Sequence, residues 1–76
     1  MFKPVGVPAR EIEVELLRHD ELEALHLCDG LGLTQEEAGE RMGVSRGTVQ
    51  RLLAEARRKV ATALVEGKAL RLETGD

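Results

Sequence analysis

The feature that most constrains the fold is the stretch from Ser45 to Glu66, which contains no proline and carries apolar residues at helical spacing. Ser45 suits the capping position before a helix, and Gly67 suits the position after one. The apolar residues of this stretch are Val49, Leu52, Leu53, Ala56, Val60, Ala63 and Leu64. A helix of that length spans roughly 30 Å. The sequence therefore predicts a single, mainly α-helical domain over residues 1–76, with a long third helix.

The material for a hydrophobic core is limited. Phe2 is the one aromatic residue, so the core must be built from twelve Leu, eight Ala and seven Val. These side chains pack well on helices but bury a modest area each, which favours an oligomer over a stable monomer. A single cysteine excludes an internal disulfide framework. No apolar run approaches the ~20 residues of a membrane span, and we expect a cytoplasmic protein.

A first helix is predicted over residues 21–29. Asp20 and Glu23 have the spacing of a capping box and would mark its start. The residues that follow at helical spacing should form its buried stripe, and they are Leu22, Leu25, Cys28 and Leu31.

A second, short helix is predicted over residues 35–42. Thr34 and Glu37 repeat the capping box, and Gly43 ends the helix at a position suited to positive φ. Two helices joined in this way form the helix-turn-helix pattern, whose core we place at residues 34–53. The predicted fold class is a tri-helical helix-turn-helix domain with two short terminal β-strands.

The ends of the chain lack helical patterning. Two prolines and a glycine within residues 1–10 predict an extended arm. Apolar residues alternate with charged ones over 12–17 and 68–73, which predicts two short strands. In the first strand the apolar side chains should be buried, and Glu11, Glu13 and Glu15 should be solvated. The predicted core is Ile12, Val14, Leu16, Leu22, Leu25, Leu33, Ala38, Met42, Val44, Val49, Leu52, Leu53 and Ala56.

The net charge of −3 conceals a strong asymmetry along the chain. Residues 1–33 carry three cations against seven anions, which gives −4. Residues 41–59 carry six cations against Glu55 alone, which gives +5. A basic block beside an acidic one is typical of a chain that presents one face to a polyanion. Double-stranded DNA is therefore the expected partner.

The face of the long helix opposite its apolar stripe is chemically suited to DNA. Arg51 and Gln50 have planar donor groups that can bind guanine and adenine edges in a major groove, and Gly47 lets the helix backbone approach closely. Hydroxyls, amides and unpaired backbone N–H groups at helix starts suit phosphates. We predict base contacts by Arg46, Gly47, Gln50 and Arg51, and phosphate contacts by Thr34, Gln35, Ser45, Arg57 and Arg58. About six phosphate contacts predict a slope near −5 for log affinity against log salt.

Most of the chain resembles a known prokaryotic family. The runs that carry the resemblance are Phe2–Pro8, Asp20–Leu25, Gln35–Ala38, Arg41–Arg46, Ala56–Ala61 and Glu66–Leu70. They are similar to the domain of unknown function numbered one hundred and thirty-four, whose members are described as DNA-binding. The helix-turn-helix of that family is similar to region four of sigma factors. The resemblance implies sequence-specific DNA binding by a transcriptional regulator. Gly39 stands where the family pattern favours Ala, and Gly47 where a longer polar residue is common.

Other functions have less support in the residues. His26 and Cys28 could suggest a metal-sensing site, but two residues apart on a helix their side chains point about 200° from each other. No nucleophile-base-acid set, phosphate loop or paired carboxylates indicate an enzyme, and no cofactor, metal or small-molecule ligand is expected. The remaining alternative is a protein-interaction module, related to sigma region four, that binds polymerase or another regulator without contacting DNA. Such a module would bind with an affinity that changes neither with salt concentration nor when Arg51 and Arg58 are neutralised.

A homodimer is expected from two features. Val60, Ala63 and Leu64 continue the apolar stripe beyond the helix-turn-helix, where so short a chain offers few partners. An isolated two-stranded ribbon is also marginal in water. Pairing within or between chains could set Glu13 or Glu15 against Lys68 or Arg71, and Leu70 and Leu72 beside Ile12 and Val14 on one buried face. Two-fold symmetry predicts an operator with inverted half-sites about 34 Å apart.

Overall fold

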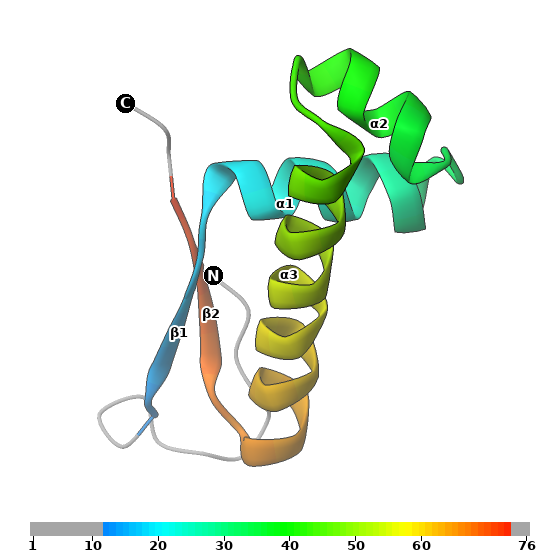
Figure 1. Cartoon of the computed structure of the whole chain (residues 1–76). Helices are drawn as coiled ribbons and strands as arrows, with labels where there is room; N and C mark the ends of the chain where they lie inside the picture. The colour runs from blue at the N-terminus through cyan, green and yellow to red at the C-terminus, as the bar shows by residue number, and fades with distance from the viewer. Residues whose placement is uncertain (1–11, 74–76) are drawn as a thin grey trace.

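The computed structural model describes residues 12–73, so the predicted arm over 1–10 and Glu11 lie outside the described residues. The elements in chain order are β1 (Val14–Leu17), α1 (His19–Leu25), a π-helical segment η2 (His26–Gly30), α2 (Gln35–Met42), α3 (Arg46–Glu66) and β2 (Ala69–Leu72). α1 and α2 pack at the N-terminal half of α3, and the two strands lie beside its C-terminal half (Figure 1). The prediction of a mainly α-helical, tri-helical domain with two short strands is confirmed.

α2 begins and ends where its capping residues predict. The Glu37 N–H donates to Thr34 Oγ1 at 3.1 Å, and the Thr34 N–H donates to a Glu37 carboxylate oxygen at 2.9 Å. Two backbone donors at the helix start are thereby satisfied. Gly43 ends the helix with a φ of 72°, a conformation that glycine adopts without a steric penalty.

α3 follows its prediction at both ends as well. Ser45 Oγ accepts the Thr48 N–H at 3.2 Å and caps the helix start. Gly67 stops the helix with a φ of 71°. The 21 residues between these caps form one uninterrupted helix, which is the longest element within residues 12–73.

α1 starts earlier than its prediction. The helix begins at His19 with Arg18 as its cap, so the predicted start at Asp20 is wrong. The Arg18 N–H donates to the carboxylate of Glu21 at 2.9 Å. Glu21 thus takes the capping-box position that was predicted for Glu23. The helix continues to the end of its predicted range as η2, with the wider hydrogen bonding of a π-helix.

The buried face of this first helix also differs from its prediction. The buried residues are Glu21, Ala24 and Leu27. The predicted stripe of Leu22, Leu25, Cys28 and Leu31 is half-buried in its first three members and exposed in the last. The buried positions precede the predicted ones by one residue, and the first of them is a carboxylate that points inward. Glu21 can do so because Lys59 of α3 pairs with it.

β1 and β2 pair in parallel within the chain, and α3 lies in the connection between them. The register sets Val14 beside Ala69 and Leu17 beside Leu72. Both strands have four residues, fewer than the predicted ranges 12–17 and 68–73. One predicted ion contact is confirmed, because Lys68 Nζ lies 3.7 Å from the carboxylates of both Glu13 and Glu15.

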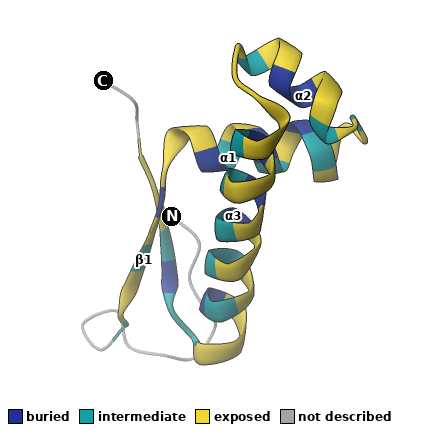
Figure 2. Ribbon diagram, viewed as in Figure 1, coloured by how far each residue is buried: buried dark blue, intermediate teal, exposed yellow. Residues whose placement is uncertain are grey.

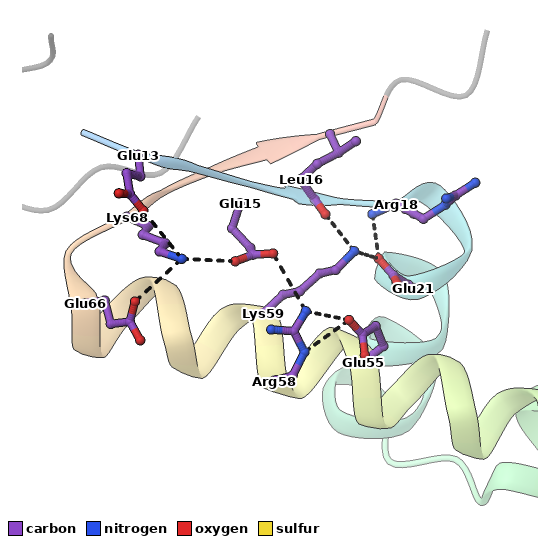
Figure 3. Close-up of polar contacts among 10 residues, drawn as sticks. All are labelled: Glu13, Glu15, Leu16, Arg18, Glu21, Glu55, Arg58, Lys59, Glu66 and Lys68. Carbon is purple, nitrogen blue, oxygen red and sulfur yellow. Dashed lines mark hydrogen bonds and ion pairs between the residues drawn. The ribbon is translucent and has the colours of Figure 1, made fainter. Parts of the chain in front are cut away.

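The predicted buried face of the strands is wrong. Three side chains assigned to it are between 44% and 50% exposed, namely Val14, Leu16 and Leu72. Leu17 of β1 and Ala69 of β2 are the strand residues that enter the core. Glu15, predicted to be solvated, is half-buried and lies near Arg58 of α3 and near Lys68, which follows α3 (Figure 3). Alternating apolar and charged residues predict that one face of a strand is buried, but they do not identify it. Here the face of β1 that carries Glu15 turns inward, toward Arg58 and Lys68.

The core is a thin, alanine-rich layer between these elements (Figure 2). Its buried apolar residues are Leu17, Ala24, Leu27, Ala38, Val49, Leu53, Ala56, Ala63 and Ala69. Leu33, Met42 and Leu52 pack at its margin, as the core prediction partly anticipated, whereas Val44 is exposed. The stripe expected to lack partners is covered in part, because Ala63 is fully buried and Val60 half-buried while Leu64 stays exposed.

Candidate nucleic-acid interface

A close helix crossing fixes how α2 meets α3. An added Cβ at Gly39 would lie 2.8 Å from the Val44 carbonyl oxygen and 3.5 Å from a side-chain carbon of Val49. The Gly39 carbonyl oxygen also accepts the Val44 N–H at 3.0 Å. Any side chain at this position would push the turn away from α2. Glycine therefore sets the geometry of the helix pair.

The predicted base-contacting residues share the outer face of α3. Val49, Leu53 and Ala56 on the inner face are at most 1% exposed. Gly47, Gln50 and Arg51, in the first two turns on the other side of the helix, are exposed, and so is Arg46, which flanks that side. Figure 2 shows this division of α3 into a buried and an exposed side. The structure thus brings the four predicted residues together on one accessible surface.

Gly47 leaves this surface open. An added Cβ would have no neighbour nearer than Ser45 Oγ at 4.0 Å. The backbone of the first turn is therefore accessible, as the predicted close approach to DNA requires. Space does not explain why this position lacks a side chain.

The predicted phosphate contacts at the helix starts are only partly accessible. Thr34 and Ser45 are exposed, and both hydroxyl oxygens already accept a capping N–H. Ser45 Oγ also lies 3.0 Å from Thr48 Oγ1. Gln35 is half-buried. A phosphate accepts hydrogen bonds, so at either helix start it would bind through a hydroxyl proton, because the hydroxyl oxygen is already used by the cap.

Arg57 and Arg58, the remaining predicted phosphate contacts, are held by carboxylates. Arg57 donates through Nε and Nη2 to the two oxygens of Asp29, at 3.0 and 2.7 Å. The hydrogen bond from this guanidinium holds the pKa of Asp29 below its ordinary value. Arg58 Nε donates to Glu55 at 3.1 Å, and Arg58 Nη2 lies 3.8 Å from Glu15 (Figure 3). The sequence indicates these cations but not their carboxylate partners.

The basic block is therefore divided in two. Within residues 12–73, no carboxylate lies within 4.0 Å of Arg41, Arg46 or Arg51. These three belong to the end of α2 and the first turns of α3. Among residues 12–73, cations without a carboxylate within 4.0 Å are thus concentrated at the end of α2 and the start of α3, while Arg57, Arg58 and Lys59 further along α3 are paired.

Lys59 and Glu21 form the buried ion pair of the fold. Lys59 Nζ lies 2.7 Å from a Glu21 carboxylate oxygen and donates to the Leu16 carbonyl oxygen at 2.8 Å (Figure 3). Their side chains are only 12% and 5% exposed. The pair ties the middle of α3 to the junction of β1 and α1. This ion pair was not predicted from the sequence, although Ala24 and Leu27 recur at helical spacing after Glu21 and could have indicated an inward carboxylate.

The described part of the chain shows no metal site and no membrane-spanning helix. No group of three or more His, Cys, Asp and Glu side chains within residues 12–73 could hold a metal ion. His26 is exposed and Cys28 is a half-buried thiol. None of the described helices combines the length and apolar character that crossing a bilayer demands.

Comparison with known proteins gives the family context. The profile of a family described as "Protein of unknown function DUF134" matches residues 1–76. A UPF0251 protein of Halothermothrix orenii is 57% identical over 75 residues, which cover 99% of this chain and 56% of that protein. A UPF0251 protein of Moorella thermoacetica is 57% identical over 74 residues, which cover 97% of this chain and 50% of that protein. The chain thus spans about half the length of the curated relatives it matches. No solved structure was found to match it.

Proposed function

The chain belongs to DUF134, a family of proteins of unknown function, and we propose that it binds double-stranded DNA sequence-specifically as a cytoplasmic transcriptional regulator. The observation that carries this proposal is the exposed start of α3. Arg46 and Arg51 project there without a carboxylate partner among residues 12–73, beside Gln50 and the open backbone at Gly47. A binding function, rather than catalysis, fits this surface.

The chemistry of these side chains suits a major groove. Arg51 can donate two hydrogen bonds to a guanine edge, and Gln50 can pair with an adenine edge. Arg46 lies where it can meet a base or a phosphate. In helix-turn-helix proteins the first helix of the motif crosses the DNA backbone, which would bring Thr34 and Arg41 of the α2 region to phosphates.

The test begins with the selection of bound genomic fragments by the purified protein. Affinity for a selected site is then measured against salt concentration, and about six phosphate contacts in the complex predict a slope near −5. Arg51→Ala should lower the affinity roughly 10- to 100-fold and alter the footprint, because one bidentate base contact contributes about 1–3 kcal/mol. Arg71→Ala is the matched control, since Arg71 is an exposed arginine of β2, away from this face.

The interaction-module alternative has one observation in its favour. Leu64 and Val65, near the C-terminal end of α3, are 58% and 85% exposed. Exposed apolar side chains of this size suit contact with another protein. A flat salt response, together with equal binding by the Arg51→Ala and Arg71→Ala variants, would reject DNA binding and favour this alternative.

We also propose that the protein acts as a homodimer. Val14 and Leu16 of β1 and Leu72 at the end of β2 are about half exposed, and a two-stranded ribbon is marginal by itself. A second copy could cover these side chains. Two-fold symmetry would then present two α3 helices to inverted half-sites about 34 Å apart.

A further inference from the structure

Asp29 links η2 to the middle of α3 through an unusually well-formed surface ion pair. Both of its carboxylate oxygens accept hydrogen bonds from Arg57, one from Nε at 3.0 Å and one from Nη2 at 2.7 Å. The Arg57 and Asp29 side chains remain 56% and 41% exposed. The pair is thus bidentate and accessible to a competing anion.

Arg57 lies on the side of α3 that we propose for DNA binding. It follows Gln50 by seven residues, which is close to two helical turns, so the two side chains leave the helix in nearly the same direction. The rise between them is roughly 10.5 Å. Arg57 is therefore the next cation along the face that begins with Arg46 and Gln50.

A carboxylate and a phosphate compete for the same edge of a guanidinium group. Each offers two oxygens to the parallel N–H groups of Nε and Nη2, so both cannot occupy that edge at once. Exposed ion pairs are weak, and the phosphate of a polyanion can displace the carboxylate. The displaced carboxylate still places a negative charge beside the DNA.

We propose that Asp29 limits the DNA affinity of this protein by occupying the edge of Arg57 that would otherwise hold a phosphate. This inference rests on the proposed DNA-binding function and deepens it. Arg57 contributes to binding only to the extent that phosphate replaces Asp29. The DNA affinity of the unmodified chain is therefore set mainly by the unpaired cations at the helix-turn-helix.

The test compares Asp29→Asn with Glu23→Gln. Both substitutions remove one negative charge and preserve size, but Glu23 is an exposed residue of α1 that takes no part in the ion pairs of residues 12–73. Asp29→Asn should bind the selected DNA about two- to fivefold more tightly than Glu23→Gln. Its plot of log affinity against log salt should be steeper by about 0.9 for each bound copy, because one more phosphate is neutralised. Asp29→Ser should show the same gain.

Arg57→Ala completes the cycle. In the wild-type background it should change the affinity by less than about twofold, whereas in the Asp29→Asn background it should abolish the gain. Equal affinities and slopes for Asp29→Asn and Glu23→Gln would overturn the inference, as would a gain that survives Arg57→Ala. If Arg51→Ala still weakens binding in that case, the DNA-binding function stands without this role for Asp29. Absence of any salt-dependent DNA binding by the wild type overturns both proposals.

Discussion

Replacing Gly39 with alanine adds only one methyl group, yet it should disturb the packing of α2 against α3. Alanine is the better helix former by about 1 kcal/mol. At this position, however, its Cβ would lie 2.8 Å from the Val44 carbonyl oxygen, a backbone atom that cannot rotate away. We expect Gly39→Ala to destabilise the fold by about 1–3 kcal/mol, as overpacking does. Urea unfolding followed by circular dichroism measures the change.

Gly47→Ala provides the matched control for that substitution. It makes the same glycine-to-alanine change in α3, at an exposed position where the atom nearest to the new Cβ is 4.0 Å away. Its unfolding free energy should equal or exceed that of the wild type, because alanine favours helix without a clash. Equal stability changes for the two variants would show that the crossing tolerates a side chain.

The ion pair of Lys59 with Glu21 should show strong energetic coupling. Lys59→Met would leave a carboxylate only 5% exposed without its cation, which costs about 3–5 kcal/mol in other proteins. Glu21→Gln keeps an acceptor for the Arg18 N–H and removes the buried charge. In that background Lys59→Met should therefore cost much less. The double-mutant cycle is measured by urea unfolding, and a coupling free energy near zero would contradict this expectation.

At the scale of elements, the cap of α2 predicts a pH dependence. The hydrogen bond from the Thr34 backbone N–H, followed by that with the Thr34 side chain, lowers the pKa of Glu37 below its ordinary value. Because the folded-state pKa is the lower one, the cap stabilises the fold above the unfolded-state pKa and loses this effect as pH falls through the folded-state pKa. Glu37→Gln should therefore unfold at lower urea than the wild type at pH 7, and the two midpoints should converge as the pH falls below the folded-state pKa of Glu37.

Glu36→Gln supplies the comparison for this effect. Glu36 is the exposed neighbour in the same helical turn and forms none of the capping hydrogen bonds. Its midpoint should follow that of the wild type over the whole pH range. A gap between Glu37→Gln and the wild type that is independent of pH would contradict the assignment of this carboxylate to the cap.

The elements differ in how far the sequence predicts them. The ends of α2 and α3 are predictable because Thr34, Ser45 and Gly67 act on the nearest turn of backbone, so the signal is local. The inward faces of β1 and α1 are not. Glu15 and Glu21 turn inward because cations far along the chain, Lys68 and Lys59, pair with them, and periodicity contains no information about such partners.

The candidate interface follows the same division. A helical wheel is sufficient to place Arg46, Gln50 and Arg51 on an exposed face, because that depends on the phase of α3 alone. The state of Arg57 depends on Asp29, which approaches from another element. The position of Arg57 on the helix is therefore predictable from the sequence, but its ion pair with Asp29 is not.

At the scale of the whole molecule, the dimer proposal predicts a concentration-dependent mass. Sedimentation at tens of micromolar should give a dimer, and an inverted repeat should bind more tightly than a single half-site. Leu16→Glu would place a charge among the half-exposed apolar side chains of the strand pair and should shift the equilibrium to monomer. Glu13→Gln, at an exposed position next to β1, should leave it unchanged. A monomer that binds both DNA targets equally would contradict the proposal.

The parallel pairing of β1 with β2 has a consequence for the order of folding. Val14 pairs with Ala69, so the pairing closes a loop that contains all three helices. Loop-closure entropy makes such a contact slow to form, whereas the caps of α2 and α3 act within single turns. The helices can therefore assemble before the strands meet, and the strands can separate while the helices persist. Within residues 12–73, the strand pair is then the part that opens most easily, and the helices are the most persistent part.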